Sequence, residues 1–122
     1  MSRIVHFEIP ADNPERATAF YAKALGWEFQ KFPGEMPYWL VRTGDDAKPG
    51  INGGLLQRRG PGQTPMLIAG VDNIDAAVSQ VDKAGGVNVV PKMAIPGVGW
   101  CAYFKDPEGN IFGIFQDDQS AK

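Results

Sequence analysis

The chain has few of the residues from which many active sites are built. Its 122 residues include one histidine, His6, and one cysteine, Cys101. A lone cysteine excludes an internal disulfide and a cysteine-rich zinc site, and one histidine cannot supply the roughly three protein ligands of a catalytic zinc site. Cys101 follows Trp100 in an expected strand, so we expect a buried structural thiol rather than a nucleophile.

Long apolar runs and clusters of basic residues are also absent. No apolar stretch approaches the roughly 20 residues that cross a bilayer, and the first residues are strand-like rather than typical of a signal peptide. The 12 basic and 14 acidic residues give a net charge of −2, and the only adjacent basic pair is Arg58-Arg59. We therefore expect a cytoplasmic protein that binds neither membranes nor nucleic acid.

A strand–helix–strands pattern occurs twice in the chain. Each copy has an apolar strand, an asparagine that can cap a helix, and a glycine after the helix. The asparagines, Asn13 and Asn73, are 60 positions apart, and the glycines, Gly26 and Gly85, are 59 apart. Duplicated units usually face one another, so matched positions are expected to converge on a shared cleft.

Periodicity and turn residues predict an α+β fold of two tandem βαβββ modules. Their curved mixed sheets are expected to surround the shared cleft, with the helices outside. We expect a single domain over residues 1–122, with module one at 1–58, a linker at 59–64, module two at 65–118 and a tail at 119–122. The expected strands are 4–9, 27–31, 37–43, 51–58, 66–71, 86–90, 100–105 and 110–116.

Alternation along the strands predicts which side chains face the helices. The other face of each first strand is expected to line a partly enclosed concavity. The helix-facing residues are expected to be Val5, Phe7 and Ile9 in one module and Leu67, Ala69 and Val71 in the other; the concave-facing ones are Ile4, His6 and Glu8, with Met66 and Ile68. The apolar stripes of the helices are Ala17, Phe20, Tyr21, Ala24 and Leu25, and Ile74, Ala77, Val78 and Val81.

Several short motifs, in this order and spacing, resemble one known family. They are Phe20-Tyr21, Leu25-Gly26-Trp27, Ile51-Asn52-Gly53-Gly54, Pro96-Gly97-Val98-Gly99-Trp100 and Asp106-Pro107-Glu108-Gly109-Asn110. Together with the doubled βαβββ pattern, they resemble the vicinal oxygen chelate superfamily, which includes glyoxalase I, bleomycin resistance proteins and extradiol dioxygenases. The resemblance covers nearly the whole chain and is greatest to small glyoxalase-like proteins.

The resemblance assigns four positions that hold a metal ion in metal-dependent relatives. By position they fall on His6, Gly54, Met66 and Gly113. Only His6 is a usual metal ligand, because glycine has no side chain and a thioether is a poor partner for most divalent cations. We therefore expect no metal and no cofactor. Gln116 could replace a ligand only through a bulge or register shift, because it alternates to the side opposite Gly113.

The expected function is metal-independent binding of a small, partly aromatic organic molecule in the cleft between the modules, as in drug-sequestering relatives. Glycines at two converging positions leave room there, and aromatic residues are expected to line it. His6 is expected to line the pocket rather than to act as a base. The predicted ligand-binding residues are His6, Trp39, Gly54, Leu56, Met66, Trp100, Gly113 and Phe115.

Two other classes of function stay open. One is an enzyme, either of glyoxalase or dioxygenase type with shifted metal ligands or a metal-free isomerase or lyase with His6 as base. The other is an interaction protein whose cleft is filled by its own side chains. The Gly53-Gly54 pair is expected to allow a bulge or a close strand approach, since it lacks the helix and lysine of a phosphate-binding loop. The resemblance also implies a homodimer.

Overall fold

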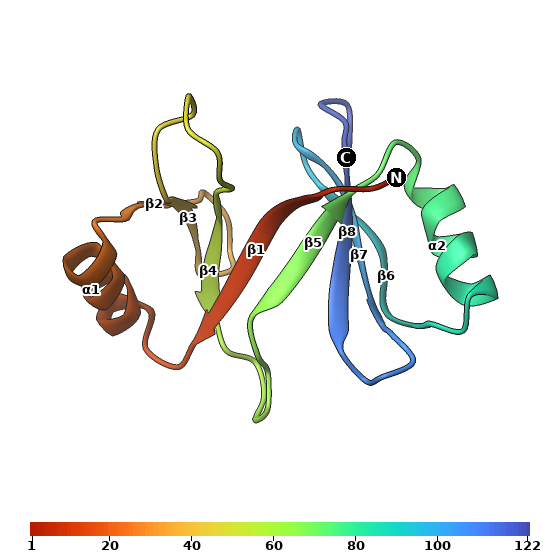
Figure 1. Cartoon of the computed structure of the whole chain (residues 1–122), viewed down its shortest axis with the longest axis horizontal. Coiled ribbons are helices and arrows are strands. Elements are labelled where there is room, and N and C mark those ends of the chain that lie inside the picture. The colour runs from red at the N-terminus through yellow and green to blue at the C-terminus, as the bar shows by residue number, and fades with distance from the viewer. The chain divides into compact units, whose positions relative to one another are not determined.

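The computed structural model describes all 122 residues and contains two helices and eight strands (Figure 1). The predicted βαβββ order is present twice, which confirms the α+β fold of tandem modules. The first copy comprises β1 (Ile4–Ala11), α1 (Pro14–Leu25), β2 (Glu28–Lys31), β3 (Tyr38–Arg42) and β4 (Gly53–Gln57). The second comprises β5 (Met66–Gly70), α2 (Ile74–Lys83), β6 (Val87–Ile95), β7 (Gly99–Lys105) and β8 (Ile111–Asp117). Neither helix is long and apolar enough to span a membrane.

Residue contacts divide the chain into two compact units. Residues 6–65 form the first unit, and residues 1–5 together with 66–122 form the second. In hydrogen-bonding order the strands run β2-β3-β4-β1 in the first copy and β5-β8-β7-β6 in the second. Strand β1 pairs in parallel with β4, and β5 pairs in parallel with β8, so the two copies share one topology.

Both helices begin where their capping residues predict. The side chain of Asn13 accepts a hydrogen bond from the backbone N–H of Arg16, and Asn73 accepts one from Ala76. Such caps satisfy backbone donors that have no partner within the helix. Helix α1 ends at Gly26, whose φ of 73° is left-handed and favours glycine.

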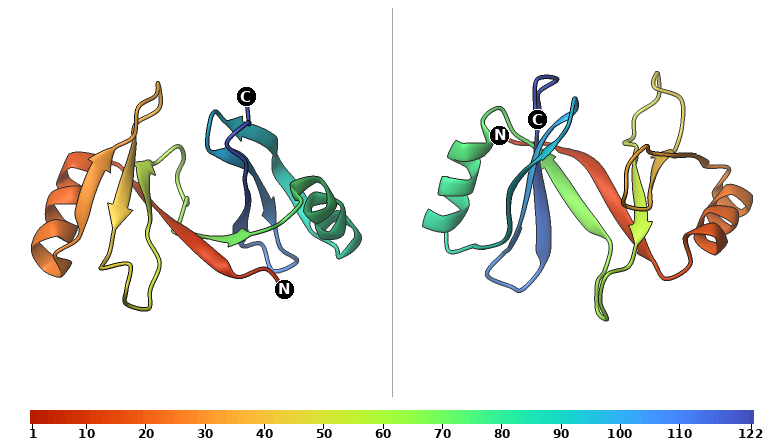
Figure 2. Two further views of the ribbon diagram at one scale, coloured as in Figure 1. Left: turned by 90° about the horizontal axis from the view of Figure 1, so that it is seen from above. Right: turned by 180° about the vertical axis from the view of Figure 1, so that it is seen from behind.

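Each helix lies against one face of its own sheet (Figure 2). Under α1 the core consists of Ala11, Val41 and Leu55, with Phe7, Tyr21 and Trp39 packed against it. Under α2 the core consists of Ala69, Ile74, Ala102 and Ile114. The opposite face of each sheet carries no helix and is called the helix-free face below.

Five of the expected helix-side residues, Ala24 on α1 among them, are instead exposed. Val5 is 43% exposed and Leu67 50%, and on α1 Phe20 is 61% and Leu25 58% exposed. For Val5 the reason is that β1 passes from the second unit to the first between residues 5 and 6; Ile4, not Val5, packs on the core of the second unit. On α1 only Pro14 is buried, and Ala17, Thr18 and Tyr21 are half-buried, so the edges of the apolar stripe remain in solvent.

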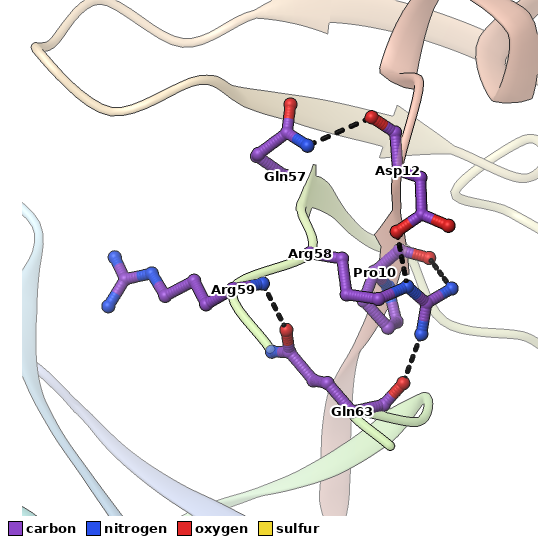
Figure 3. A network of polar contacts seen from close by, with 6 residues as sticks. All are labelled: Pro10, Asp12, Gln57, Arg58, Arg59 and Gln63. Atoms are coloured by element: carbon purple, nitrogen blue, oxygen red, sulfur yellow. Dashed lines mark hydrogen bonds and ion pairs between the residues drawn. The ribbon is translucent and has the colours of Figure 1, made fainter. Parts of the chain in front are cut away.

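The predicted linker is tied to the end of β1 by one arginine (Figure 3). The Nε of Arg58 donates to a carboxylate oxygen of Asp12 at 2.9 Å, and Nη2 donates to the carbonyl oxygen of Pro10 at 3.3 Å. Nη1 donates to the carbonyl oxygen of Gln63. A surface hollow of about 540 Å³ lies beside this network. Because all three contacts engage the guanidinium of Arg58, its role is to hold the loop.

Candidate functional site

The single histidine forms a hydrogen-bonded pair with a tyrosine. His6 lies on β1 and Tyr38 begins β3, and the Nε2 of His6 is 2.9 Å from the hydroxyl of Tyr38. Strand β4 lies between these two strands in the sheet, so the hydrogen bond passes over β4 on the helix-free face of the first unit. Both side chains are half-buried. The pair is a polar group of defined geometry on a partly covered surface.

Two adjacent glycines of β4 make room for aromatic rings on opposite faces of the sheet. A Cβ atom on Gly54 would lie 1.9 Å from the hydroxyl oxygen of Tyr38, and one on Gly53 would lie 2.5 Å from the ring of Phe7. Both distances are far inside van der Waals contact. The register of β4 with β1 and β3 is continuous, so the glycines serve close approach of side chains and not a bulge.

The structure brings three of the predicted residues of the first unit onto one face. His6 and Gly54 meet at the ring of Tyr38, and Leu56 is the cross-strand partner of Tyr38. Trp39 instead packs against the core under α1, with the ammonium of Lys31 5.6 Å from its ring centre. Tyr38, and not Trp39, is therefore the aromatic residue beside His6. Strand alternation was the signal that separates these neighbours, because consecutive side chains point to opposite faces.

The helix-free face of the second unit has a similar arrangement. Gly113 pairs with Tyr103 across the sheet, and a Cβ atom there would lie 3.1 Å from the Tyr103 ring and 2.9 Å from the side chain of Ile68. Met66 and Phe115 share this face by alternation, and Met66 is 7% exposed. At both family ligand positions occupied by glycine, a tyrosine of a neighbouring strand thus covers the backbone. The predicted ligand-binding residues included neither Tyr38 nor Tyr103.

Trp100 faces the helix side of its sheet, away from Gly113. Its ring packs against the core under α2, its Nε1 donates to the carboxylate of Asp118 at 2.9 Å, and the ammonium of Lys92 lies 4.5 Å from the ring centre. The ring and its N–H are thus both engaged by structural contacts that hold the start of the C-terminal tail. Trp100 was expected to line an open pocket, but its ring packs on the core and its N–H is hydrogen-bonded.

Gln116 and Cys101 have the structural positions that were expected. The side-chain oxygen of Gln116 accepts a hydrogen bond from the backbone N–H of Ile74 at 2.8 Å, at the start of α2. Gln116 therefore lies on the side opposite Gly113, as alternation predicts. Cys101 is 6% exposed, so it is a buried thiol.

Burial sets the charge of His6. Removal from water disfavours the imidazolium ion, which lowers the pKa of His6 below its ordinary value of 6.5, and the negative charge of Glu8 opposes this with a smaller effect. Glu8 lies two residues along the same strand and is 5% exposed. At neutral pH the imidazole is therefore uncharged, and it can donate one hydrogen bond and accept another.

Comparison with known proteins identifies the family. The family described as bleomycin resistance protein-like N-terminal matches residues 3–44. A glyoxylase-like domain-containing protein of Didymella fabae is 30% identical over 119 residues, covering 92% of this chain and 91% of that protein. This chain belongs to the vicinal oxygen chelate superfamily. CFP32, a glyoxylase-type protein of Mycobacterium tuberculosis, is 28% identical over 113 residues; the match covers 89% of this chain but 42% of CFP32.

Solved structures of the vicinal oxygen chelate type have the same fold. A glyoxalase/bleomycin resistance protein/dioxygenase superfamily member from Vibrio splendidus superposes with a TM-score of 0.67 and 15% identity, covering 96% of this chain and all (100%) of that one. Methylmalonyl-CoA epimerase from Mycobacterium tuberculosis superposes with a TM-score of 0.73 and 13% identity, covering 94% and 87%. At these identities the likeness establishes the fold alone.

The residues at the metal positions of this vicinal oxygen chelate protein do not fit a divalent cation. His6 supplies an imidazole and Met66 a thioether, while Gly54 and Gly113 supply no side chain and lie under tyrosine rings. Nowhere in the chain do three or more His, Cys, Asp or Glu side chains form a group that could hold a metal ion. We therefore assign no metal-dependent step to these residues. Gln116 does not replace a ligand, because its side-chain oxygen accepts a hydrogen bond from Ile74 at the start of α2.

Mild acid is expected to destabilise the protein through His6. The pKa of His6 is lower in the folded chain than in the unfolded chain, so between these two values the unfolded chain binds more protons. The free energy of unfolding should therefore fall as the pH drops from about 7.5 through 6.5 towards the folded pKa, and level off below it. Urea denaturation of the wild type and His6→Gln at about pH 7.5 and about pH 5.5 measures this effect.

The wild type should lose more stability than His6→Gln over this interval; equal losses would contradict the prediction. The carboxylates of Asp118 and Asp106 do not contribute to the change in stability between these two pH values. The side chain of Ser120 and the backbone N–H of Asn110 donate to Asp118 and Asp106 respectively, which lowers the pKa of each below 3.8. Their stabilising effect is lost only at more acidic pH.

Proposed function

We propose that this protein binds a small, partly aromatic organic molecule without a metal ion, on the helix-free face of the first unit. The observation that carries the proposal is the hydrogen bond between His6 and Tyr38 above Gly54. Ligand sites are mostly apolar surfaces with a few placed polar groups that set orientation. A phenol ring and Leu56 supply the apolar contact, and an uncharged imidazole supplies the polar one.

The family supports this type of function. The match of residues 3–44 is to a bleomycin resistance protein-like family, whose name refers to a drug-sized organic molecule. The donor set at the family metal positions favours a binding mode that needs no cation, since three of the four positions lack a suitable ligand.

A thermal-shift screen of planar aromatic compounds tests the proposal. Compounds that stabilise the wild type should bind Tyr38→Ala at least about tenfold more weakly, because a buried aromatic contact contributes roughly 1.4 kcal/mol or more. Phe20→Ala is the matched control, since Phe20 is 61% exposed on α1 and lies outside the site. Added chelator should leave binding unchanged.

Three results would count against the proposal. Binding that survives in both Tyr38→Ala and His6→Gln would place the ligand elsewhere. A stoichiometric divalent ion that binding requires would favour a metalloenzyme. A wild type that no compound stabilises would favour the interaction protein, and light scattering of the purified chain would then show whether the homodimer implied by the relatives forms.

A metal-free isomerase or lyase is the second candidate, favoured by one observation. His6 is uncharged and lies next to the phenol of Tyr38, so a base and an acid are close together. Exchange of the C2 hydrogen of methylmalonyl-CoA in D₂O tests one such reaction. Exchange catalysed by the wild type and lost in His6→Gln would favour the enzyme, whereas no exchange would remove this reaction from consideration.

A further inference from the structure

We propose that His6 contacts the ligand through its Nδ1–H, which donates to a neutral carbonyl oxygen, and that Tyr38 is a positioning residue that fixes this tautomer. The inference rests on the proposed function for the existence of a ligand. It adds the contacting atom, the direction of the hydrogen bond and the chemical class of the ligand.

The geometry leaves one nitrogen of His6 available. Nε2 is engaged by Tyr38 at 2.9 Å, and this is the hydrogen bond that the His6 side chain makes. No buried side-chain nitrogen or oxygen in the chain lacks a hydrogen-bond partner. Nδ1 of the half-buried ring is therefore reached by solvent and not enclosed in the core.

The chemistry of the pair decides which nitrogen carries the proton. A phenol O–H is a much stronger acid than the N–H of a neutral imidazole, and the unprotonated imidazole nitrogen is a stronger base than a phenol oxygen. The stable arrangement is therefore O–H donating to nitrogen, with Tyr38 as the donor and Nε2 as the acceptor. A neutral imidazole has one N–H, so the proton lies on Nδ1.

The surroundings select the kind of acceptor. An N–H directed to solvent binds an oxygen that accepts, such as that of a ketone, an amide or a carboxylate. Glu8, on the same strand face, exerts a negative field at His6. This field disfavours an anionic group close to the ring, so a neutral carbonyl is preferred over a carboxylate. The apolar contact of Tyr38 and Leu56 suits an aryl ketone or aryl amide.

The tautomer can be measured without any ligand. His6 is the one histidine of the chain, so every imidazole signal in a long-range ¹H–¹⁵N spectrum belongs to it. At about pH 8, where the ring is neutral, we expect a protonated Nδ1 and an unprotonated Nε2. In Tyr38→Phe we expect the signals to shift towards the Nε2–H form that free histidine prefers. A wild-type proton on Nε2, or a tautomer unchanged in Tyr38→Phe, would overturn the inference.

A pair of simple probes tests the ligand contact. Acetophenone has an aryl ring and a carbonyl oxygen, and ethylbenzene has the ring without the acceptor. The wild type should bind acetophenone about fivefold more tightly, as one net hydrogen bond predicts, and His6→Phe should abolish this preference. Equal binding of the two by the wild type would overturn the inference and leave the binding function intact. Failure of both to bind would contradict the proposed function and the contact together, while the tautomer result stands separately.

Discussion

Leu55→Ala is expected to lower the free energy of unfolding by about 2–5 kcal/mol, the usual cost of truncating a buried leucine. Leu55 is 0% exposed, on β4, and packs in the core under α1 with Val41 and Ala11. Removal of its side chain loses apolar burial and leaves a cavity. Urea denaturation followed by circular dichroism measures the change.

The matched control is Leu40→Ala on the neighbouring strand. Leu40 is 40% exposed on the helix-free side, so its truncation should cost less than about 1 kcal/mol. Because Leu55 points away from the site, its variant should keep the His6–Tyr38 hydrogen bond in the folded fraction. Similar costs for the two variants would show that the core under α1 is not where the structure places it.

Gly54→Ala is expected to cost about 1–3 kcal/mol and also to disrupt the site. The new methyl group would lie 1.9 Å from the hydroxyl oxygen and 2.2 Å from Cζ of Tyr38, so the ring must move away from His6. The imidazole signals of His6 report this loss directly, and denaturation reports the energy. Gly60→Ala is the control, because nothing lies within 4 Å of a Cβ atom there.

A double-mutant cycle separates the clash from other effects of the alanine. In a Tyr38→Ala background, Gly54→Ala should cost close to zero, since the ring is gone. In a Tyr38→Phe background the cost should persist, because the phenyl ring still occupies the space. If Gly54→Ala costs the same in all three backgrounds, Tyr38 does not cover Gly54.

The repeat was the most informative part of the sequence, and it also indicates which residues of α1 are buried. It predicted the element order, and the asparagine caps located both helix starts. The buried face of α2 is also as predicted, and α1 buries the residues 60 positions earlier: Pro14, Ala17, Thr18 and Tyr21 correspond to Ile74, Ala77, Val78 and Val81. The apolar stripe of α1 instead suggested Phe20 and Leu25, because hydrophobicity alone does not state how deeply a helix sits on its sheet.

The site was harder to predict because it depends on strand order. Tyr38 reaches His6 across β4, and no local pattern states that β3, β4 and β1 are consecutive in the sheet. Trp39 and Trp100 were predicted to line the pocket, but both lie on the helix side of their sheets. The positions of His6, Gly54 and Gly113 followed from the spacing of the repeat and the family resemblance. Leu56, Met66 and Phe115 were also predicted and lie on the helix-free faces.

The tyrosine over Gly54 makes any change of that glycine depend on a change of the ring. A carboxylate introduced at position 54 would collide with the ring, and loss of the ring alone would uncover the glycine and remove the partner of His6. A carboxylate ligand at position 54 therefore requires a change at Tyr38 as well, and positions 66 and 113 would still lack a suitable ligand.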